Sequence, residues 1–107
     1  MGPEAKIEAY LKKRVLETGG RIRKLKWIGQ RGAPDRMIWW PNADESRSGR
    51  FLPITIFIEV KAPGKHATKQ QDREHMRLRA DGFEVWVINA KASVDNLIVS
   101  LDERDPE

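Results

Sequence analysis

The sequence contains no cysteine, and this absence excludes several kinds of chemistry at once. Without thiols there is no disulfide, no thiolate nucleophile and no cysteine-ligated zinc. A metal ion would need oxygen ligands or the two histidines, His66 and His75. These lie nine residues apart with no third ligand at regular spacing, so they do not predict a zinc site.

The sequence also lacks a long apolar run. No segment approaches the ~20 apolar residues of a membrane helix, and the first residues lack the apolar stretch of a secretion signal. A chain of 107 residues is long enough for one hydrophobic core. We therefore expect a single α/β domain over residues 1–107 that is soluble, cytoplasmic and without a membrane partner.

Positive charge is concentrated in the first three quarters of the chain. Residues 1–80 hold 18 Lys and Arg against 9 Asp and Glu, whereas residues 81–107 hold 2 against 7. A basic body suits a polyanion such as nucleic acid, although a solvated charged surface explains it equally well. The candidates for phosphate contacts are Lys12, Arg14, Arg23, Lys24, Lys26, Arg31, Lys65, His66 and Lys69.

Hydrophobic periodicity predicts alternating helices and strands. We expect helices over residues 3–18, 68–80 and 94–101, and strands over residues 21–27, 37–40, 54–60 and 84–88. The strands at 37–40 and 54–60 are apolar on both faces, which is typical of central strands covered by helices on either side. The basic strand at 21–27 is typical of a sheet edge. The order α-β-β-β-α-β-α predicts a mixed sheet flanked by helices.

Two carboxylates form the candidate chemical centre. A hairpin that turns around position 47, inside the loop-like residues 42–50, pairs Asp35 with Glu59 and also pairs apolar residues of the two strands. Directly opposed side chains share a face with β-carbons ~5 Å apart, so the two anions would repel each other unless a cation lies between them. Asp35 alone could be a turn former, and Glu59 could emerge into water or pair with Lys61. Their matched register favours a metal site.

Three more side chains are candidates for the same site. Lys61 projects from the same face as the acid two residues before it, about 6.6 Å further along the strand, and could contact a phosphate, although surface lysines are common. Glu8 lies on the core-facing side of its helix, which is unusual for an acid unless a cation is near, but it could equally pair with Lys12. Gln71 fits a capping box with Thr68, so its spacing alone indicates no catalytic role.

These residues in order, Glu8, Pro34-Asp35, Glu59-Val60-Lys61 and Gln71, resemble the PD-(D/E)xK nuclease superfamily. Within it, the spacing from residue 59 through Gln71 to residues 82–87 resembles the VRR-NUC domain. The resemblance implies a DNA endonuclease that depends on Mg²⁺ or Mn²⁺. It implies that Asp35 and Glu59 are metal ligands, Glu8 a further acidic ligand directly or through water, and the Val60 carbonyl the group that completes the shell. Lys61 would be the catalytic lysine and Gln71 a second-rank active-site residue.

The expected substrate follows from the family and from symmetry. Stand-alone relatives occur in phages and bacteria, and a domain with one active site could cut two strands by pairing with itself. We therefore expect a homodimer that acts on branched DNA such as Holliday junctions in a bacterial or phage-infected cell. The alternatives are a non-catalytic nucleic-acid-binding module with the same fold and a protein whose basic face binds an acidic partner. The combination of Asp35, Glu59 and Lys61 favours the enzyme, because a pure binder gains nothing from anions beside a phosphate.

Overall fold

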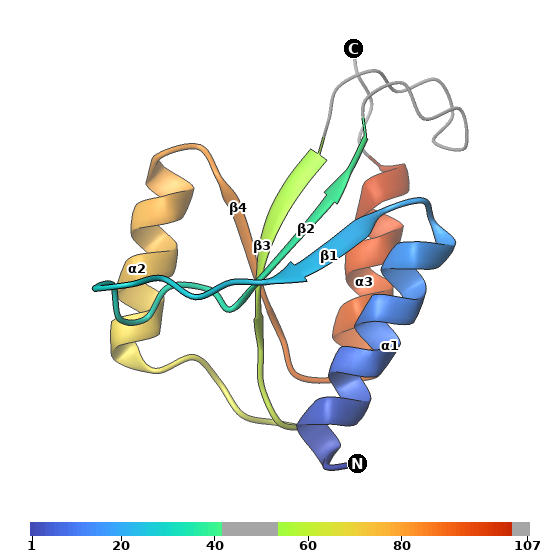
Figure 1. The fold of residues 1–107 in the computed structure, drawn as a ribbon, viewed down its shortest axis with the longest axis horizontal. Coiled ribbons are helices and arrows are strands. Elements are labelled where there is room, and N and C mark those ends of the chain that lie inside the picture. Colours follow the sequence, from blue (N-terminus) through green and yellow to red (C-terminus); the bar gives the residue numbers. More distant parts are fainter. Residues whose placement is uncertain (42–53, 104–107) are drawn as a thin grey trace.

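The computed structural model describes residues 1–41 and 54–103 (Figure 1). The elements along the chain are α1 (Pro3–Glu17), β1 (Arg21–Lys24), β2 (Arg36–Trp40), β3 (Ile54–Val60), α2 (Lys69–Ala80), β4 (Glu84–Ile88) and α3 (Lys91–Asp102). This order confirms the predicted α-β-β-β-α-β-α arrangement. None of the helices in the described ranges is long and apolar enough to cross a bilayer.

Local sequence explains where the first two helices begin. Pro3 lies at the first position of α1, where a missing backbone N–H costs no hydrogen bond, and Ile7, Leu11 and Val15 follow at four-residue intervals on the buried side. Helix α2 starts with a complete capping box formed by Thr68 and Gln71.

The four strands form one mixed sheet in the order β1-β2-β3-β4. The β1–β2 and β2–β3 pairs are antiparallel, whereas β3 and β4 are parallel and are joined through α2. The strands β1 and β4 are therefore the outer strands of the sheet. The basic strand β1 has the edge position that its composition predicts.

The register between β2 and β3 confirms the predicted hairpin pairing. The observed partners include Met37 with Phe57, Ile38 with Ile56, and Trp40 with Ile54. The turn around position 47 lies outside the described residues. The confirmed part of the hairpin prediction is therefore the pairing of the two strands.

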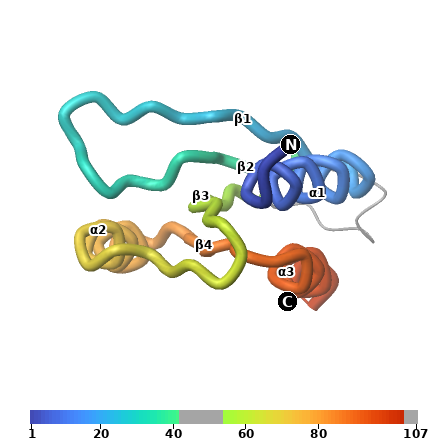
Figure 2. The backbone as a smooth tube through the Cα atoms, turned by 90° about the horizontal axis from the view of Figure 1, so that it is seen from below, coloured from blue at the N-terminus to red at the C-terminus, as the bar shows by residue number. Residues whose placement is uncertain are grey.

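The main core lies between the sheet and two helices, α1 and α3, which cover the same face, while α2 lies on the opposite face (Figure 2). Leu11, Ile38 and Leu97 are completely buried in this core. Trp40 is also completely buried, and its indole N–H donates to Thr18 Oγ1 at 3.0 Å. The chain passes so close to this ring that a Cβ on Gly20 would lie 2.6 Å from it.

The opposite face of β2 differs from the prediction. Met37 and Trp39 are only partly buried, and a loop over residues 25–35 lies on the side where a helix was expected (Figure 2). The loop reaches the first turn of α2, since a Cβ on Gly32, at φ +83°, would lie 2.8 Å from the Gln70 carbonyl oxygen. Helices thus cover both faces of β3 but only one face of β2.

Two element boundaries also differ from the prediction. The strand expected over residues 21–27 ends at Lys24, because its partner β2 begins at Arg36 and the chain then turns into the loop. The Trp27 indole N–H donates to the Pro34 carbonyl at 2.8 Å, a contact inside that loop. Helix α3 begins at Lys91 rather than at residue 94. Its first turn was not predicted because that turn carries no apolar periodicity.

Candidate functional site

Asp35 and Glu59 lie side by side at one end of the sheet. The last β2–β3 pair is Arg36 with Ile58, so these two acids are one position beyond that ladder: Asp35 directly precedes β2, and Glu59 lies on β3. The Asp35 Oδ1 atom accepts a hydrogen bond from the Val60 backbone N–H at 3.3 Å. This bond fixes the Asp35 carboxylate against the end of β3.

The Glu59 carboxyl is buried and lacks a hydrogen-bond partner for one oxygen. Only 5% of the residue is exposed, and Oε1 has no partner among the described residues. Burial, and then the negative charge of Asp35, raises the pKa of Glu59 to about 7. Glu59 therefore does not emerge into water. An isolated buried carboxylate is costly, so this oxygen is suited to bind a cation or carry a proton.

His75 is a buried neighbour of Glu59 that the sequence analysis did not place in the site. It lies on α2, is 0% exposed, and neither ring nitrogen has a hydrogen-bond partner among the described residues. Its Nε2 atom is 3.8 Å from Glu59 Oε1. Burial, and then the positive charge of Arg79, lowers the pKa of His75. The lowered pKa favours the neutral form of the His75 imidazole beside Glu59.

Glu8 reaches the site through Arg36, another residue that the sequence analysis did not select. The Arg36 guanidinium, at 9% residue exposure, places Nε 3.0 Å and Nη2 2.8 Å from Glu8 Oε1. Its Nη1 donates to the Asp35 backbone carbonyl at 2.9 Å and lies 3.3 Å from Asp35 Oδ2. Glu8 is therefore paired with Arg36, a partner that neither alternative of the sequence analysis named, and its role as a metal ligand stays a prediction.

Lys61 and Gln71 have different local roles. The Lys61 backbone N–H donates to the Ile88 carbonyl at 2.9 Å, which ties the end of β3 to β4. The positive charge of Lys61 opposes the rise in the pKa of Glu59. The Gln71 Oε1 atom accepts from the Thr68 backbone N–H at 2.9 Å. The capping role of Gln71 is therefore confirmed, and its role in catalysis stays a prediction.

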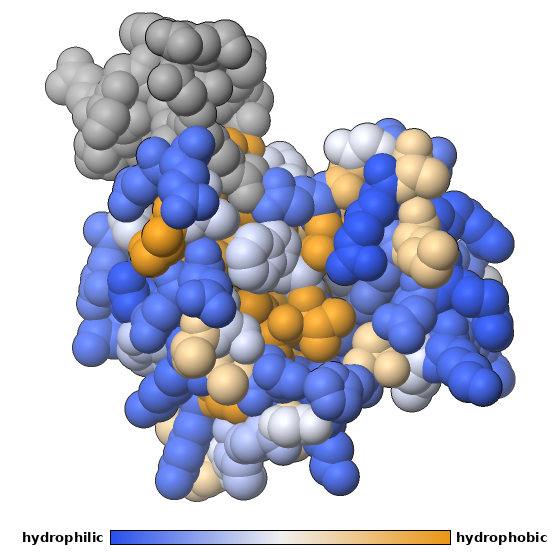
Figure 3. Space-filling model, turned by 180° about the vertical axis from the view of Figure 1, so that it is seen from behind, coloured by the Kyte–Doolittle hydropathy of each residue, from blue (hydrophilic) through white to orange (hydrophobic). Residues whose placement is uncertain are grey.

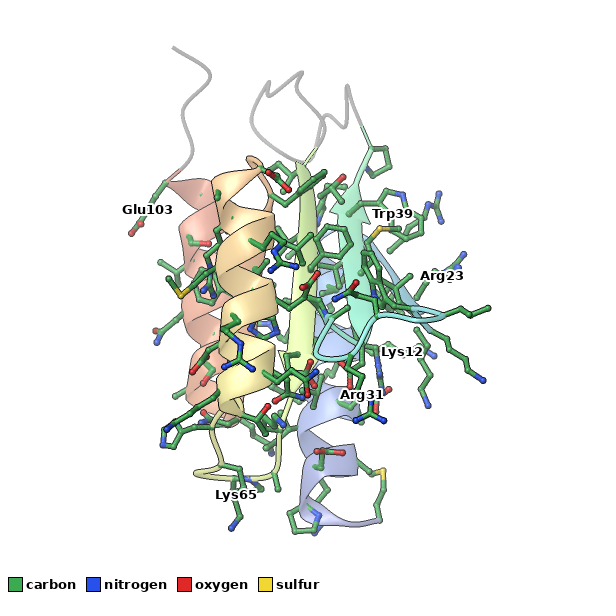
Figure 4. All side chains as sticks on the ribbon, turned by 90° about the vertical axis from the view of Figure 1, so that its left-hand side faces the viewer. Lys12, Arg23, Arg31, Trp39, Lys65 and Glu103 are labelled. Atoms are coloured by element: carbon green, nitrogen blue, oxygen red, sulfur yellow. The ribbon has the colours of Figure 1, made fainter. Side chains whose placement is uncertain are left out.

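The predicted phosphate-binding residues separate into two exposed groups and one partly buried residue. Lys12, Arg23 and Arg31 project along the β1 side of the molecule, whereas Lys65 lies in the loop before α2 (Figure 4). The remaining exposed members are Lys24 and Lys26 in the first group, and His66 and Lys69 in the second.

Arg14 differs from the other basic candidates because it is partly buried and its charge is paired with acids of the same chain. It forms ion pairs with Asp95 and Glu17, and its Nη1 donates to the Tyr10 hydroxyl at 3.0 Å. The hydrogen bond with Tyr10 is the largest cause of the raised pKa of Arg14. A contact between Arg14 and a phosphate stays a prediction, and it would have to compete with these partners.

The tryptophans also differ in what they offer a nucleic acid. Trp40 belongs to the core, and the Trp39 ring lies under the Arg23 guanidinium at 5.4 Å from its centroid. Trp27 is 37% exposed and packs edge-on against Phe57. Among these three, Trp27 is the one that combines an exposed surface with a position in the loop that carries Asp35.

The acidic end of the sheet suits a hard cation with few protein ligands. In residues 1–41 and 54–103, no three Asp, Glu or His side chains form a ready metal cluster. Mg²⁺ is commonly bound by one or two carboxylates and keeps several waters or substrate phosphates as its other ligands. Asp35 and the unpartnered oxygen of Glu59 fit that donor set, with Glu8 held further away on Arg36.

Comparisons with known proteins identify the family and the fold. The model of the VRR-NUC domain family matches residues 10–92, a range that includes Asp35, Glu59, Lys61 and Gln71 but not Glu8. The chain is 40% identical over 88 residues to "Putative nuclease p44" of Acyrthosiphon pisum secondary endosymbiont phage 1, covering 82% of this chain and 84% of that protein. A solved structure described as a VRR_NUC domain is 32% identical with a TM-score of 0.77, covering 92% of this chain and 97% of that one.

Proposed function

Because the chain belongs to the VRR-NUC domain family, we propose that it is a nuclease that hydrolyses DNA phosphodiester bonds with a divalent metal ion, Mg²⁺ or Mn²⁺. The observation that carries this proposal is the buried Glu59 oxygen, Oε1, which has no hydrogen-bond partner in the described part of the chain and belongs to the residue opposite Asp35 in the β2–β3 register. The name of the phage relative supports the same activity.

In this proposal, Asp35 and Glu59 hold the ion, the Val60 carbonyl completes its protein ligands, and Glu8 acts through water. When bound, a divalent ion supplies a Lewis acid for the phosphate and lowers the pKa of water. The Asp35 carboxylate is kept in place by the Val60 N–H, at 3.3 Å, and by Arg36. Burial of Glu59 excludes water from one side of its carboxyl, which strengthens its interaction with a cation.

Lys61 contributes a positive charge on the same face as Glu59. The ammonium group orients the attacking water or stabilises the charge that grows on the phosphate oxygens. Its backbone is anchored to Ile88 on β4, so the charge is carried by an ordered strand end. Gln71 contributes at second rank from the first turn of α2.

We propose branched DNA, such as a Holliday junction, as the substrate of a homodimer. Two copies related by a two-fold axis match the symmetry of a four-way junction. Apolar side chains gather between α2 and α3 on the face shown in Figure 3, within a largely hydrophilic surface, and this patch is the candidate contact between copies. The exposed basic residues of the β1 side would contact phosphates without reading sequence. The phage relative suits action in the cytoplasm of a bacterial or phage-infected cell.

The test is a cleavage panel of linear, flapped and four-way DNA with Mg²⁺, with Mn²⁺ and with EDTA. We expect metal-dependent cleavage that is fastest on the four-way DNA. Asp35→Asn should lose cleavage by roughly a hundredfold or more and keep DNA binding, because it removes a ligand without removing the basic surface. Asp102→Asn, an exposed acid at the end of α3, is the matched control and should cleave like the wild type.

Three results would contradict parts of the proposal. Cleavage that survives Asp35→Asn and Glu59→Gln would remove both residues from the mechanism. Tight binding without cleavage in either metal would favour the non-catalytic binding module. A single chain bound to each four-way junction would exclude the homodimer.

A further inference from the structure

The acidic end of the sheet already contains a positive charge that belongs to the protein. Arg36 begins β2 and is buried on the same side of that strand as Ile38 and Trp40. From there its guanidinium contacts Glu8 on α1 and Asp35 in the adjoining loop. A single side chain therefore joins two of the three acids proposed for the site.

All three guanidinium nitrogens are engaged by these two acids. Nε and Nη2 share Glu8 Oε1 at 3.0 and 2.8 Å, and Nη1 bonds the Asp35 backbone carbonyl at 2.9 Å with Oδ2 at 3.3 Å. A buried charge is stable only when it is paired and hydrogen-bonded, and Arg36 meets both conditions.

We infer that the Arg36 guanidinium is an internal cation of the site, which stabilises the protein without metal and weakens its affinity for a divalent ion. This inference rests on the proposed function, because it assumes that Asp35 and Glu59 hold the ion. The stabilising effect follows from the clustered acids, which would repel each other without Arg36. The weakening effect follows from repulsion between the guanidinium and a divalent ion that shares the Asp35 carboxylate.

Arg36 also explains the place of Glu8. Its Oε1 atom is bonded by two guanidinium nitrogens, so Glu8 stays on the α1 side of the sheet end while Arg36 keeps its charge. In the metal-loaded protein, Glu8 therefore acts through Arg36 or water and does not ligate the ion directly. Arg36 is on this account a positioning residue.

The experiment measures Mn²⁺ binding by calorimetry and thermal unfolding in EDTA, at one fixed pH, for the wild type, Arg36→Gln and Arg36→Lys. We expect Arg36→Gln to bind Mn²⁺ about tenfold more tightly or better, because it removes the repelling charge. Without metal its Tm should fall by several degrees, and saturating Mn²⁺ should raise its Tm more than that of the wild type. Arg36→Lys keeps the charge and should bind Mn²⁺ like the wild type. Arg77→Gln makes the same chemical change at an exposed arginine of α2 and should change neither quantity.

The possible results distinguish an effect of the Arg36 charge from an effect of Arg36 on the positions of the carboxylates. If Arg36 served only to hold the carboxylates in place, both Arg36→Gln and Arg36→Lys would bind Mn²⁺ more weakly, and that result would overturn the inference. Equal Mn²⁺ affinity in Arg36→Gln and the wild type would also overturn it. Should Arg36→Gln be unfolded in EDTA, recovery of its circular dichroism on adding Mn²⁺ supports the inference, and failure to recover contradicts it.

Asp35→Asn distinguishes failure of this inference from failure of the proposed function. If the wild type binds Mn²⁺, Asp35→Asn does not, and Arg36→Gln gains no affinity, then the metal site stands and only the role of Arg36 is wrong. If Asp35→Asn binds Mn²⁺ like the wild type, the proposed metal site is wrong, and the inference fails with it.

Discussion

The two faces of the sheet differ in whether their buried polar atoms have hydrogen-bond partners. On the α1 and α3 face, apolar side chains such as Leu11 and Ile38 are fully buried, and the one buried polar group of Trp40 has its hydrogen bond. On the α2 face, near the end of β3, Glu59 Oε1 and both ring nitrogens of His75 are buried without hydrogen-bond partners among the described residues. The first face is organised for stability. The second keeps uncompensated polar groups, which natural proteins retain mainly at functional sites.

The largest expected effect on stability lies on the core face. Leu11→Ala should lower the free energy of unfolding by about 2–5 kcal/mol, because Leu11 is fully buried and the surrounding helices and strands cannot close the cavity completely. Urea unfolding measures this change, and Leu16→Ala at an exposed position of α1 is the control. A loss of under about 1 kcal/mol would show that this face is not tightly packed.

The next largest effect is expected on the α2 face, where Glu59→Gln should raise the free energy of unfolding, whereas Leu11→Ala lowers it. The pKa of Glu59 is about 7 in the folded protein against an ordinary value of 4.5, so the folded state binds this proton more tightly than the unfolded state. Stability therefore falls as the pH rises from about 4.5 to 7 and stays low above that, by about 3 kcal/mol in total. Glu59→Gln removes this loss and should be more stable than the wild type at pH 8 but not near pH 4.5.

Urea unfolding in EDTA at the two pH values checks this prediction. Glu103→Gln, an exposed acid after α3, should show the pH dependence of the wild type. A Glu59→Gln variant that is less stable than the wild type at pH 8 would mean that the Glu59 carboxylate is compensated in the folded state, and the contrast between the faces would disappear.

A smaller effect is expected at His75. Neither ring nitrogen has a hydrogen-bond partner within residues 1–41 and 54–103, and such buried groups cost roughly 1–3 kcal/mol in desolvation. His75→Leu should therefore raise the free energy of unfolding by about 1 kcal/mol. Thermal unfolding in EDTA measures the change, with Met76→Leu at an exposed position of the same helix as the control. A clear destabilisation would show that the imidazole makes a bond that stabilises the fold.

The smallest effect is expected on the basic edge, which belongs to neither face. Lys24→Gln should leave stability nearly unchanged and weaken DNA binding to a similar extent on every sequence, because a phosphate contact carries no sequence information. The slope of log affinity against log salt should decrease by about 1. An unchanged salt dependence would remove Lys24 from the DNA surface.

Much of the fold was predictable because it depends on local patterns. Helix α1 shows a four-residue apolar spacing, and the β2–β3 register follows from matching two apolar strands about one centre. The length of β1 was not predictable, because it depends on where its partner β2 begins. The loop over one face of β2 was missed for the same reason, since apolar residues on both faces do not show whether a helix or a loop covers them.

The site was predictable where chemistry and register coincide, as for Asp35 and Glu59. Arg36 was missed because it was treated as one of many basic residues, although it shares the buried side of β2 with Ile38 and Trp40. His75 was missed because histidines were considered as zinc ligands. Its position one turn after Gln71 places it on the side of α2 that faces the sheet, but the contact with Glu59 depends on how α2 packs, which the sequence does not contain.

The most direct test of the central claim is the anomalous scattering of Mn²⁺ in crystals of the protein grown with this ion. We expect a peak at the end of the sheet, with Mn²⁺ ligated by carboxylate oxygens of both Asp35 and Glu59. A crystal that shows Mn²⁺ bound elsewhere, with Glu59 still buried beside His75 and free of the ion, would contradict it.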